Sequence, residues 1–534
     1  MHLSHGRPSD IAAAPSGCDW ERSHPLNDLG TPVAASLSLR ARLNQWAASP
    51  APWVFFLLLG AAIRLRQYFF ASSYWYDEAY LVLAIRERGF AALLGPQPYN
   101  LVIPPFFLWA VRGLYQLGGD GELLMRLPAF LAGMTALVLM IPLARRFLAA
   151  PWSVWAFALL AVSPHAVAHG CEVRPYTVDL LVAEWILLCV VALTESDGRG
   201  RRWAYAGLGA AAILGPWMSF PSVFLLGGAS AALLVRVGTR PTLAGWLGWT
   251  AFHATVAASG VLLWWASARA MYYPGMIEHW GHKGWGGFPD WHSTFATGRW
   301  LLYRPYEVAN YANRDLGLLL APLALVGAIG LAFRGPARAA LLAVPFLLAV
   351  GAALVGKYPL AHRTTVFLMP CLWLLAAVGL AHLASWMGRH RGKAVVFGVL
   401  LAAYAASWTV SGMIQPLSGL DYREAYQFVQ NQKETDDAIF AQMAVVYQTY
   451  YGKDAAVLKD EDFPKAEHLA GERRLWAVIG ATRFDLRRRL EAAGGRVALE
   501  HRVGGLVVLL FAPESSTADV KEPLTQSKPF QPAE

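Results

Sequence analysis

Long apolar runs, separated by short basic turns, dominate the chain between residues 51 and 413. A helix needs about 20 mainly apolar residues to cross the hydrocarbon core of a bilayer. This pattern predicts about eleven transmembrane helices. They are expected near residues 51–70, 124–144, 152–168, 175–194, 203–217, 220–236, 243–266, 316–333, 339–356, 364–386 and 394–413.

Basic residues are concentrated in five of the turns between these runs, namely Arg145–Arg146, Arg199–Arg202, Arg236–Arg240, Arg334–Arg338 and Arg389–Lys393. Short cytoplasmic loops of membrane proteins carry an excess of Lys and Arg. All five turns fall on one side of the membrane if the N-terminus is inside. The charge pattern therefore supports both the number of helices and this orientation.

Two long segments between the runs, residues 72–123 and 268–315, are predicted to be external loops. The first contains apolar stretches near 78–92 and 104–117 that are too short to span, so they are expected to lie along the membrane surface. The second is rich in Trp, Tyr, His and Gly and is expected to be a solvated loop.

The end of the chain has a different pattern. Over residues 415–516, short β-like apolar runs alternate with helical stretches, which is typical of a small α/β domain. This domain is expected outside the membrane, after a membrane domain covering 49–414. Residues 1–48 and 517–534 are polar and are expected to be disordered tails, the first of them cytoplasmic. The predicted fold class is therefore a membrane all-α protein with a small C-terminal extracytoplasmic α/β domain.

Composition agrees with a protein that lies mostly in lipid. The chain is 56% hydrophobic and only 15% charged, against about 25% charged residues in soluble proteins. The net charge is +9, but the basic residues lie in the turns, so membrane orientation explains them and no nucleic-acid partner is expected. The four cysteines form no CxxC motif, and no disulfide framework or zinc site is predicted.

The first candidate for chemistry is the adjacent pair Asp77 and Glu78 in the sequence YWYDEAY, just beyond the first predicted helix. Carboxylates at a membrane surface are costly unless they are solvated, paired or functional. Asp77 could instead simply cap a helix that begins near Glu78. The flanking aromatic residues suit both a membrane-interface belt and a surface on which a sugar stacks.

Seven further residues at the same predicted membrane face are candidates for substrate binding: Arg64, Arg126, Glu172, Arg174, Tyr176, His362 and Arg363. Asp179 follows on the same face. An arginine can bind a phosphate through two charge-assisted hydrogen bonds, or it can only anchor a helix at the interface. Together these acidic and basic groups suit a substrate that is part lipid and part anionic, with a second, hydrophilic substrate arriving from outside.

The order of these motifs resembles the membrane glycosyltransferases of the GT-C fold. W-x-D-E-A surrounds Asp77, a Pro-Pro pair follows, G-x-x-E-x-x-x-R-L-P-A contains Arg126, an Arg-Pro-Tyr element begins at Arg174, and Arg363 comes late in the chain. The most similar branch contains the protein O-mannosyltransferases and the lipid A aminoarabinose transferase. The resemblance extends over roughly residues 50–420.

This resemblance implies an enzyme that moves a sugar from a polyprenyl-phosphate donor to an acceptor hydroxyl on the outer face, with inversion. By analogy Asp77 is the general base, Glu78 is its neighbour, and Arg363, supported by Arg174 and Arg126, stabilises the leaving phosphate. The acceptor is left open as a glycan, a lipid or a protein. The expected location is a bacterial inner membrane, with the active site facing the periplasm.

The chain departs from the family at Val102 and Ile103, where many relatives have His or a nearby acid before the Pro pair. No cofactor or metal is predicted, although a divalent metal on His279, His282 and His292 stays open as an alternative whose spacing matches no strong template. Two other functions also stay open. They are a membrane carrier or flippase for lipid-linked sugars, which the lack of an internal repeat disfavours, and a non-catalytic family member.

Overall fold

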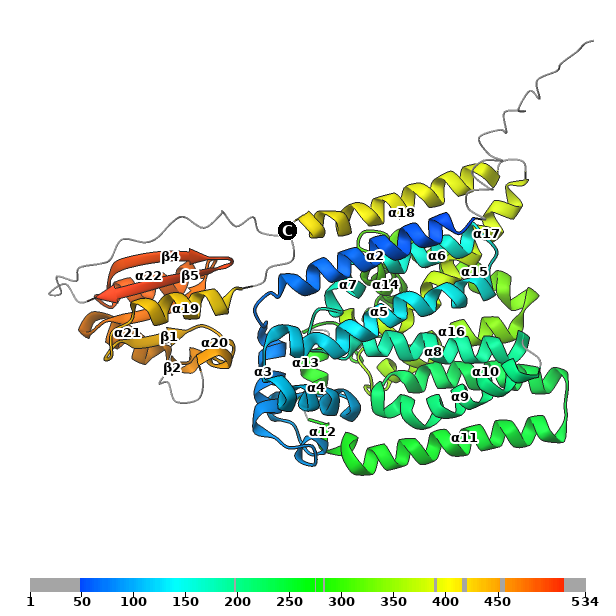
Figure 1. Cartoon of the computed structure of the whole chain (residues 1–534), viewed down its shortest axis with the longest axis horizontal. Helices are drawn as coiled ribbons and strands as arrows, with labels where there is room; N and C mark the ends of the chain where they lie inside the picture. The colour runs from blue at the N-terminus through cyan, green and yellow to red at the C-terminus, as the bar shows by residue number, and fades with distance from the viewer. Residues whose placement is uncertain are drawn as a thin grey trace, which may run out of the picture. The chain divides into compact units, whose positions relative to one another are not determined.

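The computed structural model describes residues 49–512, except 196–197, 274, 282–283, 389–390, 415–419 and 452–456. The predicted tails, 1–48 and 517–534, lie outside the described residues. A large bundle of helices is followed in the sequence by a five-stranded sheet (Figure 1).

A helix lies at each of the eleven predicted positions. The helices of the bundle are α2 (Ala51–Phe70), α5 (Glu122–Phe147), α6 (Trp152–Ala161), α7 (Pro164–His169), α8 (Tyr176–Glu195), α9 (Arg199–Met218), α10 (Ser222–Thr239), α11 (Leu243–Leu263), α15 (Gly317–Arg334), α16 (Pro336–Leu354), α17 (Met369–Trp386) and α18 (Arg391–Ile414). Within the described residues, eight helical stretches are long and apolar enough to cross a membrane. The α6, α9 and α18 positions fall short of that length and composition. The predicted membrane all-α class is thus confirmed, whereas the count of eleven spans is not.

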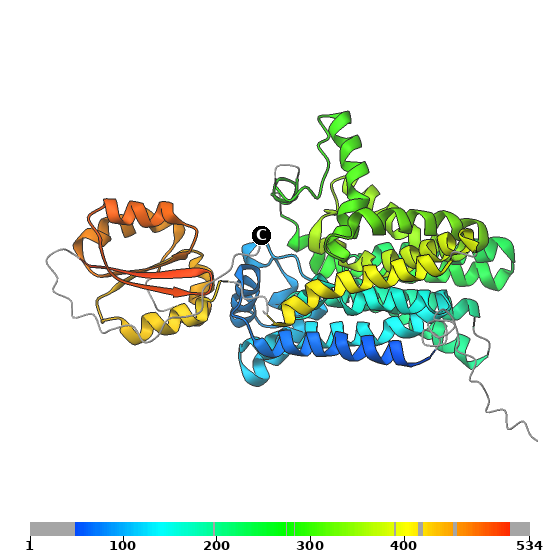
Figure 2. The same cartoon turned by 90° about the horizontal axis from the view of Figure 1, so that it is seen from above.

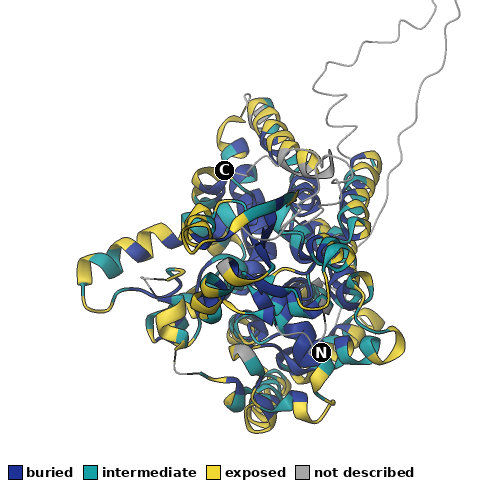
Figure 3. Cartoon of the chain, turned by 90° about the vertical axis from the view of Figure 1, so that its left-hand side faces the viewer, coloured by how far each residue is buried: buried dark blue, intermediate teal, exposed yellow. Residues whose placement is uncertain are grey.

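The outer surfaces of the bundle helices expose large apolar side chains. Leu58 is 63% exposed, Leu325 62% and Phe333 85%. Buried residues gather inside the bundle and exposed ones on its outer faces (Figure 3). Soluble monomers rarely expose apolar surface on this scale, so we assign these faces to contact with lipid.

A break between α6 and α7 shows how the sequence shapes the bundle. Pro164 begins α7 and has no N–H to donate to the carbonyl of Leu160, so α6 cannot continue through it. The Arg64 guanidinium donates to two carbonyls at this break, of which that of Leu160 also accepts from the Ser163 backbone N–H at 3.3 Å. Its Nη2 lies 3.1 Å from the Leu160 oxygen, and its Nη1 lies 3.0 Å from the Ala161 oxygen. Arg64 is 1% exposed, so it caps a broken helix rather than extending to the membrane surface.

We expect Arg64→Met to lower the free energy of unfolding by about 1–3 kcal/mol for each carbonyl that loses its partner. Thermal unfolding of the purified protein in detergent measures this effect. Arg66→Met is the matched control, because Arg66 is exposed on the same helix and stacks on Phe70. Equal unfolding midpoints for the two variants would refute the capping role of Arg64.

A helix is present at each of the two positions near 78–92 and 104–117, as α3 (Tyr76–Glu87) and α4 (Pro105–Gly118). The turn between α10 and α11 lies at the opposite end of the bundle from them (Figure 1). The segment 268–315, predicted as an external loop, contains helices that were not expected from the sequence: α12 (Arg269–Met271), α13 (Met276–Trp280) and the 19-residue α14 (Thr294–Ala312). Trp300, Arg304 and Val308 form a buried stripe at a spacing of four residues along α14, so the helix is amphipathic rather than continuously apolar.

The predicted C-terminal α/β domain is confirmed. Its strands are β1 (Ala438–Ala441), β2 (Val457–Leu458), β3 (Leu475–Gly480), β4 (Arg496–Val503) and β5 (Leu506–Ala512), and its helices are α19 (Tyr422–Gln432), α20 (Ala444–Tyr451), α21 (Phe463–Glu472) and α22 (Phe484–Ala492). The strand order is β2-β1-β3-β5-β4, with β2, β1 and β3 parallel and the β3–β5 and β5–β4 pairs antiparallel. Helices cover both faces of the sheet (Figure 2). Accordingly, every residue of β3 and β5 is buried.

Candidate active site

A cavity of about 790 Å³ lies at the end of the bundle that carries α3 and α4. Its walls come from α3, the segment before α4, the start of α8, the turn between α9 and α10, the segment around α13 and the turn before α17. Residues far apart in the sequence therefore meet around one space. Four of the predicted site residues line it: Asp77, Arg174, Tyr176 and Arg363.

Asp77 lies between two arginines. Its Oδ2 is 2.5 Å from Nη1 of Arg363 and 3.8 Å from Nη2 of Arg174. The ring of Tyr176 lies beside both guanidinium groups, with its centroid 5.6 Å from the Arg174 carbon and 6.0 Å from the Arg363 carbon. The Asp77 and Arg363 side chains are each 20% exposed. A carboxylate and two cations thus share one partly shielded, solvent-connected site.

A tight turn in front of α17 precedes Arg363. His362 has a φ of 50°, in the left-handed region that residues other than glycine seldom adopt. The turn is held by Thr364, whose hydroxyl lies 2.7 Å from the Pro359 oxygen and 2.8 Å from the Ala361 oxygen. Unusual backbone conformations persist where the surroundings fix them, often at functional sites.

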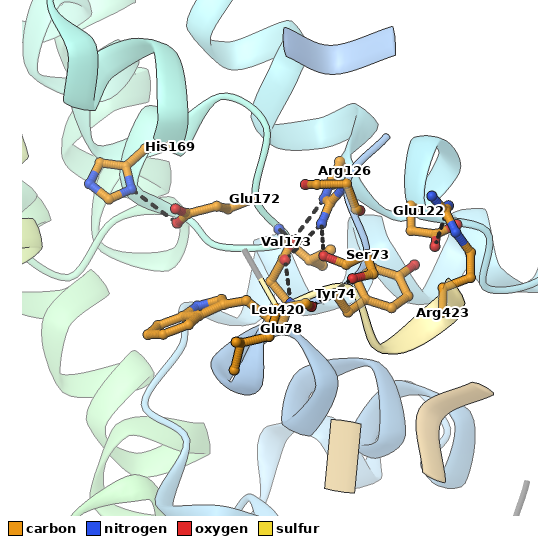
Figure 4. Close-up of polar contacts among 12 residues, drawn as sticks. Ser73, Tyr74, Glu78, Glu122, Arg126, His169, Glu172, Val173, Leu420 and Arg423 are labelled. Carbon is orange, nitrogen blue, oxygen red and sulfur yellow. Dashed lines mark hydrogen bonds and ion pairs between the residues drawn. The ribbon is translucent and has the colours of Figure 1, made fainter. Parts of the chain in front are cut away.

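Glu78 is turned away from the cavity and is fully occupied by hydrogen bonds. Its two carboxylate oxygens accept from Nε and Nη2 of Arg126, both at 2.8 Å, and from the backbone N–H groups of Val173 at 2.7 Å and Trp75 at 3.1 Å (Figure 4). Glu78 and Arg126 are each 2% exposed. Successive residues on a helix point about 100° apart, so Asp77 and Glu78 cannot both face the same space.

Arg126 also binds the backbone in front of α3. It donates to the carbonyl oxygens of Ser72 at 2.7 Å and Ser73 at 3.3 Å. The Glu78–Arg126 pair therefore fastens the segment that carries Asp77. This geometry favours a positioning role for both residues, whereas the sequence predicted catalysis for Glu78 and substrate binding for Arg126.

The remaining predicted site residues do not line the cavity. Glu172 Oε2 lies 3.0 Å from His169 Nδ1 (Figure 4), and His169 Nε2 lies 2.7 Å from the Tyr311 hydroxyl. Burial alone would raise the pKa of Glu172, but His169 and then the arginines Arg174 and Arg363 hold this pKa below its usual value. Glu172 is therefore a carboxylate that interacts electrostatically with the two arginines of the cavity wall.

His362 does not line the cavity either. Its Nε2 is 3.8 Å from Glu307, and its ring meets the Trp285 ring edge-on with 5.5 Å between centroids. Arg64 is further removed, since it caps α6 inside the bundle. The predicted substrate contacts of Arg64 and His362 are thus not found in the cavity wall.

No group of three or more His, Cys, Asp or Glu side chains that could hold a metal occurs among the described residues. Of the three histidines considered from the sequence, His279 lines the cavity, His292 is exposed, and His282 lies outside the described residues. The cavity also contains Lys357 and Tyr358, which no sequence motif singled out.

The C-terminal domain contributes hydrogen bonds close to the Asp77 segment. The Tyr450 hydroxyl accepts from the Tyr74 backbone N–H at 2.7 Å and donates to Glu122 at 3.0 Å. Arg423 Nη1 lies 2.9 Å from the same Glu122 oxygen (Figure 4). Tyr74 stands three residues before Asp77. The α/β domain therefore helps to fix the backbone that leads into α3.

Removal of this contact by Tyr450→Phe is expected to lower the rate of the sugar transfer that the family resemblance implies about tenfold, because a hydrogen bond to a charged group contributes about 1.5–3 kcal/mol and the segment before Asp77 loosens. Steady-state transfer assays with the full chain measure the rate. Tyr303→Phe is the control, since Tyr303 is 51% exposed and does not line the cavity. An unchanged rate in Tyr450→Phe would show that the domain does not act on the site.

Comparisons with known proteins agree with this architecture. The sequence model of the family described as dolichyl-phosphate-mannose-protein mannosyltransferase matches residues 102–265. The crystal structure of ArnT from Cupriavidus metallidurans bound to undecaprenyl phosphate superposes with a TM-score of 0.50 and 15% identity, covering 87% of this chain and 98% of that chain. The chain has a GT-C fold.

The resemblance to GT-C membrane glycosyltransferases that the motifs predicted is thereby confirmed. A further similar structure, the Archaeoglobus fulgidus oligosaccharyltransferase with zinc and sulfate, has a TM-score of 0.48 and 12% identity over 86% of this chain and 73% of that chain. Among curated proteins, none matches the sequence. Within the GT-C fold, the cavity next to Asp77 is the candidate active site.

Proposed function

We propose that the protein is an inverting glycosyltransferase that moves a sugar from a polyprenyl-phosphate donor to an acceptor hydroxyl. The observation that carries this proposal is the placement of Asp77 between Arg363 and Arg174 in one cavity. A base beside two cations suits a reaction in which a hydroxyl loses its proton while a phosphate leaves.

In the proposed step, Asp77 takes the proton of the acceptor hydroxyl while that oxygen attacks the anomeric carbon. The bond between the anomeric carbon and the phosphate oxygen breaks, and its electron pair leaves with the lipid phosphate. Arg363 and Arg174 stabilise this charge. No general acid is needed, because the leaving group is already a stable anion.

The same arrangement implies an exchange of partners. Arg363 pairs with Asp77 in the structure, so a donor phosphate that binds Arg363 competes with the Asp77 carboxylate for it. Donor binding would then leave Asp77 available to the acceptor hydroxyl. The proposal thus predicts that the donor binds before the acceptor.

An apolar part of the cavity suits the lipid of such a donor. Leu101, Val102 and Pro104 line it together with the charged groups. Each CH₂ group that leaves water contributes about 0.8 kcal/mol. The solved ArnT structure contains undecaprenyl phosphate, which supports a lipid of this class as the carrier here.

We further propose that the cavity faces the periplasm of a bacterial inner membrane. The five basic turns would lie in the cytoplasm under the positive-inside rule, and α3, α4 and the turn before α17 belong to the other side. The domain that begins after residue 415 would share this outer side, which agrees with its hydrogen bonds to Tyr74 and Glu122.

The function is tested with the purified full chain in lipid vesicles. A panel of labelled polyprenyl-phosphate pentoses, hexoses and amino sugars is offered with an extract of outer-face glycans, lipids and proteins. We expect one sugar to leave its carrier and join an acceptor. If a donor binds and moves across the bilayer but no sugar is transferred, the protein is a carrier and not an enzyme.

A further inference from the structure

A second carboxylate in the cavity has no role in the reaction described so far. Asp179 lies in the first turn of α8 and lines the cavity, although it is only 7% exposed. The Ser219 hydroxyl interacts with the Asp179 carboxylate, but neither Asp179 Oδ1 nor that hydroxyl has a partner at full hydrogen-bond geometry among the described residues. Buried polar groups are nearly always hydrogen-bonded, so an unpaired carboxylate oxygen beside a cavity calls for a ligand that donates to it.

The chemistry of that ligand follows from the carboxylate. A polyprenyl chain has no donor, and packing it against Asp179 would leave the oxygen unpaired in an apolar environment. A sugar hydroxyl is a donor of suitable size. Phe220 and Tyr358 also line the cavity, and flat apolar rings beside a polar group are a common setting for a sugar ring.

The distance from the proposed phosphate site is suitable as well. Asp179 follows Tyr176 by three residues, which on a helix is about 4.5 Å of rise on nearly the same face. The Tyr176 ring lies beside both Arg174 and Arg363. Because the transferred sugar is bonded directly to the phosphate, a phosphate held by the two arginines places the sugar ring in the same cavity that Asp179 lines.

We propose that Asp179 binds a hydroxyl group of the donor sugar and so contributes to the choice of sugar. This inference rests on the proposed function, because it takes the two arginines as the phosphate site. An acceptor sugar would present the same hydroxyl chemistry, so the test must separate donor from acceptor.

The test compares two ligands without any acceptor: bare polyprenyl phosphate and the polyprenyl-phosphate sugar that the wild type consumes. Their dissociation constants are measured for the wild type, Asp179→Ala and Asp179→Asn in lipid nanodiscs. We expect Asp179→Ala to weaken binding of the sugar-bearing donor at least tenfold and to leave bare polyprenyl phosphate within twofold. Asp179→Asn should lose less, because its amide oxygen still accepts a hydrogen bond.

Glu184→Gln is the matched control. Glu184 is fully buried on the same helix, both of its carboxylate oxygens have no hydrogen-bond partner among the described residues, and it does not line the cavity. This variant should leave the ratio of the two dissociation constants unchanged. Using the ratio within each variant also corrects for any loss of folded protein.

Three results would overturn the inference. If Asp179→Ala weakens the binding of both ligands equally, Asp179 has a structural role and does not bind the sugar. Unchanged donor binding with a raised KM for the acceptor would assign Asp179 to the acceptor. A wild type that binds neither ligand would refute the proposed function, and the inference with it.

Discussion

Replacement of Asp77 by Asn is expected to reduce the rate of sugar transfer about 10²–10⁴-fold, the range that general-base catalysis contributes. Asn has nearly the same shape, and its carbonyl oxygen can still accept from Arg363, so the cavity should keep its form. The amide cannot take a proton from the acceptor hydroxyl. Single-turnover transfer from a pre-bound donor isolates this chemical step.

The same substitution, Asp77→Asn, also has an expected effect on the affinity for the donor. Arg363 is paired with the Asp77 carboxylate at 2.5 Å, and the neutral amide competes less for it. The dissociation constant of the donor should therefore stay equal or fall in Asp77→Asn. A variant that loses both binding and transfer would point to a collapsed site.

A matched control is available close by in the chain. Asp120 is paired with Arg86 and does not line the cavity, so Asp120→Asn should transfer at nearly the wild-type rate. A transfer rate for Asp77→Asn within threefold of wild type would remove Asp77 from the role of base. The GT-C fold itself would be unaffected by that result.

The convergence of Asp77, Arg174 and Arg363 was predictable because it needs only the order of the spans. Once apolar runs fix which turns share a membrane face, a carboxylate after the first span and an arginine before a late span fall on the same side. The structure adds the contact, since Arg363 lies 286 positions after Asp77 and only tertiary packing brings them to 2.5 Å.

Arg64 shows what the sequence could not decide. An arginine near the end of a span usually extends to the interface, and nothing within α2 indicates otherwise. Besides the Gly60 carbonyl in its own helix, its partners are backbone carbonyls 96 and 97 positions away. Those two carbonyls lie where Pro164 breaks a neighbouring helix, so the local pattern at Arg64 was ambiguous and the packing decided its role.

The sequence contained enough information to predict the orientation of Glu78 and the presence of α14. Neighbouring residues on a helix point about 100° apart, so the sequence already indicated that Asp77 and Glu78 face different directions. The prediction that both are catalytic followed the family motif instead. The amphipathic spacing of Trp300, Arg304 and Val308 is present in the sequence, but two arginines and Pro305 hid it from a search for apolar runs.

Glu78→Gln is expected to lower the free energy of unfolding by about 3–5 kcal/mol, the usual cost of breaking a buried ion pair by removing one partner. Every neighbour of the carboxylate is a donor: two nitrogens of Arg126 and the backbone N–H groups of Val173 and Trp75. A glutamine amide would direct its own N–H₂ group at these donors and find no acceptor there. Thermal unfolding in detergent measures the loss.

The same variant separates a positioning role from catalysis. If Glu78 only positions α3, replacing both members of the pair, as in Glu78→Gln with Arg126→Gln, should recover part of the stability, because no buried charge is left unpaired. Glu491→Gln breaks the exposed pair with Arg487 and should cost under about 1 kcal/mol, which calibrates the assay. A Glu78→Gln protein with a wild-type unfolding midpoint and no transfer activity would instead place Glu78 in the chemistry. The four donors around its carboxylate argue against that outcome, since a carboxylate held by four hydrogen bonds has no free lone pair directed toward the cavity.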